Sequence, residues 1–170
     1  ALLTMTPAQV AALTAQQIAA LTSEDMLAFT SAQLQASSAA QIQAFETRDL
    51  VYLTPTQLVS GFNAAAIAAL TTQQVAWLTT RQLAALTSDQ IAAIEDADIA
   101  AMRTSQIQAL TAAQVSQGLS VSQLAALTTA QAAALTTRQI VALSAAQVAA
   151  LETEDVAALK TQQTAALSTD

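Results

Sequence analysis

A step of eight residues between leucines, or equivalent apolar residues, recurs through almost the whole chain and constrains its fold more than any other feature. The step links Leu13, Leu21 and Phe29, and it runs in the same way from Leu127 to Leu159. Written out, the unit is L-T-x-x-Q-I-A-A, and about twenty copies of it fill the chain. We call this unit the octad. Any fold for this sequence must place one structural element in each octad.

The octad fits neither one long helix nor a β-strand. Eight residues at about 100° each overshoot two helical turns by roughly 80°, so the leucines would wander around a continuous helix. A strand is disfavoured because Ala and Gln are poor strand formers and the apolar residues show no period of two. One helix and one corner per octad is the remaining interpretation.

The octad matches the start of a helix position by position. Thr is a favoured N-cap residue, and Gln three positions later completes a reciprocal capping box. The stretch L-T-P-T-Q-L tests this assignment, since Pro55 directly follows Thr54 and precedes Gln57. Proline is favoured at the first helical position, which is where the octad places Pro55. Pro7 occupies the same place in M-T-P-A-Q-V.

These features predict an all-α solenoid, or superhelix, of very short helices of about one and a half turns, one per octad. Such helices are marginal alone, so they must stack on their neighbours. The sequence leaves open whether octads pair into hairpins or wind individually around an axis.

A longer period of 57 residues is superimposed on the octad. Gly61 and Gly118 each add one residue to an octad and lie 57 positions apart. The predicted organisation is one continuous array over 1–170, with units of about 5–61, 62–118 and 119–170. We expect each glycine to form a left-handed C-terminal cap and to correct the superhelical phase. We also expect the chain to be a segment of a longer array or to stack end to end.

Composition excludes several classes of function. The chain has no Cys and no His, so thiolate metal sites, disulfides and the commonest general base are absent. A net charge of −7 with five Lys and Arg argues against nucleic-acid binding. Thr and Gln interrupt every apolar stretch, which argues against a membrane span. We therefore expect no catalytic residues, no cofactor and no metal.

Two sets of polar residues invite a functional interpretation. The glutamine column is either a ladder of exposed amides that binds a partner or a set of helix caps, and capping is favoured because Asp substitutes at Asp25, Asp49, Asp98 and Asp155. The acidic clusters Glu95–Asp98 and Glu152–Asp155 are oxygen-rich. They lack the glycine-containing loop of typical calcium sites, so first-turn helix stabilisation is favoured for them as well.

Aromatic residues are the best candidates for contact with a partner. Trp77 and Tyr52 replace the small residue that usually ends the octad. Together with Phe29, Phe45 and Phe62 they could form a recognition patch, although aromatic side chains more often fill a core. Trp77 and Tyr52 are the predicted partner-binding residues, whereas Thr54, Pro55, Gln57, Gly61 and Gly118 are predicted to be structural.

The phrase L-T-x-x-Q-[IV]-A-A resembles the short tandem repeats, rich in Ala, Leu, Thr and Gln, of large bacterial secreted or cell-surface, adhesin-like proteins. The segment Leu53–Leu58 also resembles the helix opening of TAL-effector DNA-binding repeats, but no base-reading loop follows it. The first resemblance implies a non-catalytic spacer, stalk or fibre segment with an extracellular or cell-surface location. The alternative is a solenoid scaffold that binds proteins or peptides, and end-to-end self-association is the other expected contact.

Overall fold

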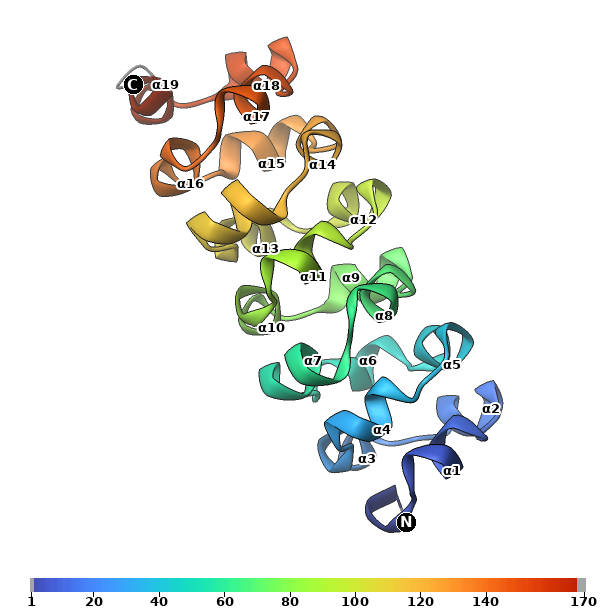
Figure 1. Ribbon diagram of the computed structural model, residues 1–170. Coiled ribbons are helices and arrows are strands. Elements are labelled where there is room, and N and C mark those ends of the chain that lie inside the picture. Colours follow the sequence, from blue (N-terminus) through green and yellow to red (C-terminus); the bar gives the residue numbers. More distant parts are fainter. Residues whose placement is uncertain (1, 168–170) are drawn as a thin grey trace. The chain divides into compact units, whose positions relative to one another are not determined.

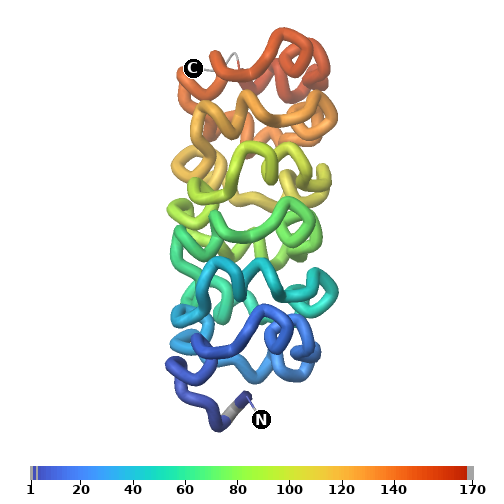
Figure 2. Tube along the Cα trace, turned by 90° about the vertical axis from the view of Figure 1, so that its right-hand side faces the viewer, coloured from blue at the N-terminus to red at the C-terminus, as the bar shows by residue number. Residues whose placement is uncertain are grey.

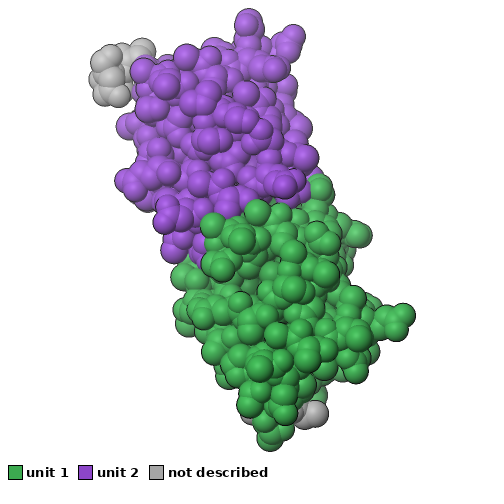
Figure 3. Space-filling view, turned by 45° about the vertical axis from the view of Figure 1, so that its right-hand side comes forward, with its two compact units in different colours: residues 1–86 green, residues 87–170 purple. Residues whose placement is uncertain are grey.

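Short helices follow one another along the chain, and a corner of a few residues separates each from the next (Figure 1). The computed structural model describes residues 2–167, and no strand occurs in that part of the chain. The chain divides into two compact units, Ala1–Leu86 and Thr87–Asp170, which Figure 3 distinguishes by colour. The all-α prediction is therefore confirmed, with one short helix per octad.

The first unit contains η1 (Leu2–Thr4), α1 (Pro7–Ala11), α2 (Ala15–Ala19), α3 (Ser23–Ala28), α4 (Ser31–Gln35), α5 (Ala39–Ala44), α6 (Thr47–Leu50), α7 (Pro55–Gly61), α8 (Ala64–Ala68), α9 (Thr72–Trp77) and α10 (Thr80–Ala85). The second unit contains α11 (Ser88–Ala92), α12 (Asp96–Ala101), α13 (Thr104–Ala109), the π-helical turn η2 (Gln114–Gly118), α14 (Val121–Ala125), α15 (Thr129–Ala134), α16 (Thr137–Val141), α17 (Ala145–Ala149), α18 (Thr153–Ala158) and α19 (Thr161–Leu167).

Capping boxes explain where most of the helices begin. At α7 the Gln57 backbone N–H donates to Thr54 Oγ1 at 3.2 Å, and the Thr54 N–H donates to Gln57 Oε1 at 2.7 Å. Pro55 is the first residue of this helix. Both hydrogen bonds satisfy backbone donors that have no partner inside the helix. The same reciprocal box begins most of the other helices, so a helix start is encoded in nearly every octad.

Within each unit the octads wind individually and do not pair into hairpins. A helix packs on the third helix after it: α1 on α4, α4 on α7 and α7 on α10 in the first unit, and α11 on η2, α15 on α18 and α16 on α19 in the second. The trace of each unit accordingly winds as a series of stacked coils (Figure 2). This arrangement settles the alternative that the sequence left open.

The core is built from two apolar positions of the octad, the Ile or Leu after Gln and the Leu that opens the next octad. Leu58 and Phe62 illustrate the two positions, with 0% and 1% of their surface exposed. Phe29 and Phe45 meet edge to face with ring centroids 5.6 Å apart. Because Phe29, Phe45 and Phe62 are all buried, they are core residues and do not join a surface patch.

The glycines lengthen a helix and do not form left-handed caps, so that expectation is wrong. Neither Gly61 nor Gly118 has a positive φ. In the first unit Gly61 becomes the last residue of α7, and the following N–H, of Phe62, donates to Leu58 O at 3.0 Å. In η2 the turn that holds the extra residue is a π-helix, which is wider than an α-helix.

Close packing between turns explains why the extra residue is glycine. A Cβ on Gly61 would lie 2.7 Å from Leu34 Cβ, and a Cβ on Gly118 would lie 3.0 Å from Ile91 Cβ. Leu34 belongs to α4 and Ile91 to α11, the helices on which α7 and η2 pack. The absence of a side chain therefore allows the lengthened helix to stay in contact with the preceding turn.

Candidate functional site

Ten buried glutamines of the column form a ladder of hydrogen bonds between successive turns. Each of these side chains donates from Nε2 to main-chain carbonyl oxygens 28 to 32 residues earlier. We call this set the glutamine ladder and each member with its carbonyls a rung. Its members are Gln33, Gln41, Gln57, Gln74 and Gln82 in the first unit and Gln123, Gln131, Gln139, Gln147 and Gln163 in the second.

Gln131 shows how one side chain stabilises two helices. Its Oε1 accepts from the Thr128 N–H at 2.7 Å and caps the start of α15. Its Nε2 donates to Ile99 O at 2.8 Å and to Met102 O at 2.7 Å, which lie at the end of α12. Only 2% of the residue surface is exposed. The amide therefore accepts from a backbone N–H at the start of one helix and donates to carbonyl oxygens at the end of another.

The ladder explains the 57-residue period. Gln57 reaches back 28 residues to Phe29 O, and Gln74 reaches back 29 residues to Phe45 O because Gly61 lies in between. Half of 57 is 28.5, so one 57-residue unit corresponds to two turns of the superhelix. Each turn therefore takes between three and four octads. Sequence reasoning found the capping function of Gln and missed its bond to the earlier turn.

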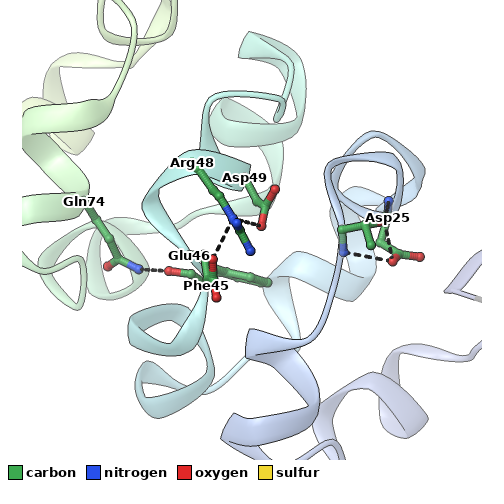
Figure 4. Close-up of polar contacts among 7 residues, drawn as sticks. Asp25, Phe45, Glu46, Arg48, Asp49 and Gln74 are labelled. Atoms are coloured by element: carbon green, nitrogen blue, oxygen red, sulfur yellow. Dashed lines mark hydrogen bonds and ion pairs between the residues drawn. The ribbon is translucent and has the colours of Figure 1, made fainter.

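Asp replaces Gln at two rungs whose partner turn lies in the same unit. Asp49 and Asp155 are 7% and 2% exposed, and the residue three before each is Glu in place of Thr. Neither Glu46 nor Glu152 makes a side-chain cap bond. Beside Asp49, the Arg48 Nε lies 2.7 Å from Glu46 Oε2 and 3.7 Å from Asp49 Oδ2 (Figure 4).

Asp25 also stands in the glutamine column, but it belongs to the first turn of the array. Its Oδ2 accepts from the Thr22 N–H at 3.0 Å and from Thr22 Oγ1 at 2.9 Å (Figure 4). These two hydrogen bonds, the backbone one first, lower the pKa of the Asp25 carboxyl. Asp25 is thus a helix cap, which agrees with the interpretation of first-turn acids as stabilising.

The two predicted partner-binding residues lie on neighbouring turns of the first unit. Tyr52 follows α6 and is 49% exposed, and Trp77 ends α9 and is 53% exposed. Leu27 of α3 is 56% exposed. Since α3 packs on α6 and α6 packs on α9, these three residues follow three successive turns. We call Leu27, Tyr52 and Trp77 the apolar column. The sequence did not predict that Leu27 is exposed, because no sequence pattern distinguishes it from the many buried leucines.

A surface hollow of about 460 Å³ lies beside Tyr52. Its lining includes Leu21, Thr22, Ser23, Arg48 and Asp49. The hollow therefore lies at the rung where Asp49 replaces a glutamine. The Arg48 charge is balanced by Glu46 and Asp49. Within the described residues no three Asp or Glu side chains converge in a way that could hold a metal ion. The hollow is thus lined by the Tyr52 ring, by the hydroxyls of Thr22 and Ser23, and by the Arg48–Asp49 ion pair.

Comparison with known protein families finds a repeat similar to part of the chain. The model of the ALTTAQ repeat matches residues 42–80, 60–88 and 91–117. A comparison with curated proteins finds no match. Within the described residues, none of the helices combines the length and the apolar character needed to cross a bilayer. Residues 42–88 and 91–117 are therefore a tandem octapeptide repeat region similar to the ALTTAQ repeat family.

Proposed function

We propose that the chain is a non-catalytic structural segment, a spacer, stalk or fibre-forming part of an exported or surface-attached bacterial protein. The observation that carries this proposal is the glutamine ladder. Ten octads use the glutamine side chain to bond one turn to another, and the apolar side chains of the octads fill the core. Such a division of roles suits an array whose task is to extend and hold its form.

The ladder also supports a mechanical role. Each rung joins residues about thirty positions apart, so extending the array requires rupture of buried hydrogen bonds turn by turn. Charge and composition support the same proposal. The net charge of −7 disfavours binding to nucleic acid, and a surface rich in Thr, Ser, Gln and Ala disfavours insertion into a bilayer. End-to-end association of arrays would extend such a segment further. Sedimentation velocity over a range of concentrations tests that part, and a monomer at every concentration contradicts it.

The location of the intact parent protein tests export. An antibody raised against the 170-residue chain should label intact bacteria that express the parent protein. Labelling that requires permeabilised cells would contradict the surface location, while leaving the structural role of the array untouched. An antibody against a cytosolic protein serves as the control for cell integrity. Stretching a single chain between two handle domains tests the mechanical role, with repeated small force peaks expected.

A second candidate function is a scaffold that binds another protein or a peptide. The apolar column favours it, because three large apolar side chains stay exposed on successive turns of the first unit. A partner that uses this surface should be captured by the wild-type chain and lost with Trp77→Ala or Tyr52→Ala. Val141→Ala is the matched control, since Val141 is equally exposed, at 54%, and lies in the second unit. Equal loss with the control would contradict a role of the column.

A further inference from the structure

One main-chain carbonyl in the second unit departs from the pattern of the ladder. In most rungs the residue that opens an octad offers its carbonyl oxygen to a glutamine of a later turn. The oxygens of Ile94, Met102, Leu110, Leu119 and Leu135 all accept from such an amide. Leu127 opens an octad of the same series, and among the described residues no side chain donates to its oxygen.

The ladder assigns Asp155 to this carbonyl. Gln147 bonds to Leu119 and Gln163 bonds to Leu135, in each case 28 residues earlier. Asp155 lies midway between these glutamines, and Leu127 is 28 residues before it. A carboxylate accepts hydrogen bonds and does not donate them, and Asp is one methylene shorter than Gln. At this rung the ladder therefore places an acceptor, the Asp155 carboxylate, opposite the Leu127 carbonyl oxygen. At the neighbouring rungs a glutamine donor takes that place.

The Asp155 carboxylate is also without a partner. Its Oδ2 is buried and makes no hydrogen bond within the described residues, and the whole residue is only 2% exposed. A buried carboxylate with no compensating charge or donor is costly. The charged neighbours along α18 are Glu152 and Glu154, both exposed, and α15, on which α18 packs, carries no charged residue. The ion pairs of the described residues both involve Arg48, in the other unit.

We infer that Asp155 Oδ2 and the Leu127 carbonyl oxygen bind a hard cation, and that calcium is the ion best suited to the position. Calcium accepts carboxylate and main-chain carbonyl ligands in flexible geometry and completes its shell with water. The exposed Glu152 and Glu154 raise the local negative charge to −3 and attract a divalent ion. The ion would replace the amide of a normal rung as the link between the two turns. This inference is independent of the proposed structural role.

Amide hydrogen exchange of the full chain tests the site, with calcium chloride as the probe and sodium chloride at matched ionic strength as the control. We expect calcium to slow exchange at residues 124–128 and 152–156 and to raise the Tm by about 2–4 °C. Half-saturation is expected at about 10⁻⁴–10⁻³ M, the range of extracellular calcium modules. Exchange at residues 99–103, beside the intact Gln131 rung, should stay unchanged.

The variant Asp155→Gln separates a cation site from a general effect of salt. A glutamine restores the amide donor of the neighbouring rungs, so this variant should fold, gain protection at 124–128 without calcium and lose the response to calcium. Asp89→Gln is the matched control, because it removes an acidic charge from an exposed position of the same unit and should retain the response. The inference is overturned if calcium and sodium act alike, or if Asp155→Gln still responds to calcium.

Discussion

Asp49 in the first unit and Asp155 in the second occupy the same position of the octad, yet their surroundings differ in charge. Asp49 follows Arg48, whose guanidinium also pairs with Glu46. Asp155 follows Glu154, and its Oδ2 has no partner within the described residues. Both positions interrupt the series of amide rungs.

At both positions a change of hydrogen-bonding type comes together with a change of charge. A glutamine is neutral and both accepts and donates, so it satisfies two turns by itself. A carboxylate cannot donate a hydrogen bond to the carbonyl of the earlier turn, and its burial without a partner costs free energy. In the first unit the chain supplies the compensating cation as Arg48, whereas in the second unit we expect an ion from solution.

The largest expected effect is the loss of an intact rung. Gln74 and Gln131 lie 57 residues apart, and both donate to two carbonyls at 2.8 Å or less. Substitution of either by Ala removes the donor to the carbonyl of Phe45 or Met102 and also removes a cap. We expect a loss of about 2–4 kcal/mol in the free energy of unfolding, similar for both variants. Urea denaturation followed by circular dichroism measures it.

Two further variants calibrate this loss. Gln17 makes the capping box, but it lies in the first turn and is exposed, so Gln17→Ala should cost about 1 kcal/mol. Gln73 is exposed beside Gln74, and Gln73→Ala should cost less than about 0.5 kcal/mol. If Gln74→Ala were no worse than Gln17→Ala, the bond to the earlier turn would contribute nothing to stability, and the ladder would be only a set of caps.

The sequence was sufficient for the local part of this architecture and insufficient for the part that joins distant turns. Thr54, Pro55 and Gln57 specify a helix start through contacts within four residues, and these contacts depend on little else. The bond from Gln57 Nε2 to Phe29 O spans 28 residues, and only the number of octads per turn determines its partner. The spacing of 57 residues between Gly61 and Gly118 equals the sum of one rung of 28 residues and one of 29 residues. The number of octads per turn could be read from that spacing only after the length of one rung was known.

The second prediction concerns these glycines. Gly61→Ala should destabilise the first unit by about 1–3 kcal/mol, because the new Cβ would lie 2.7 Å from Leu34 Cβ and 2.8 Å from its Cδ1. Gly118→Ala should cost less, since its closest contact is 3.0 Å and a π-helical turn can adjust. Ser60→Ala, at an exposed neighbouring position, is the control. Urea denaturation compares the three variants, and equal losses for the two glycines would contradict the difference in packing.

The smallest effects on stability, and the sharpest test of the comparison, come from exchanging the charges beside the two aspartates. Arg48→Gln removes the counterion of Asp49. Since Arg48 is 75% exposed, we expect a loss of at most about 1 kcal/mol at low ionic strength, together with a new calcium-dependent protection of residues 18–22. Glu154→Arg places a cation beside Asp155 and should abolish the calcium response at 124–128 without unfolding the chain.

These two variants make opposite predictions for one measurement, hydrogen exchange with and without calcium. Arg48→Gln should create a calcium response in the first unit, and Glu154→Arg should remove one from the second. Arg81→Gln controls for the loss of a positive charge elsewhere in the first unit, because Arg81 is exposed in α10 and makes no ion pair within the described residues. A response that follows net charge alone would appear with Arg81→Gln as well, and the neighbouring charge would then not explain how each aspartate is tolerated in the ladder.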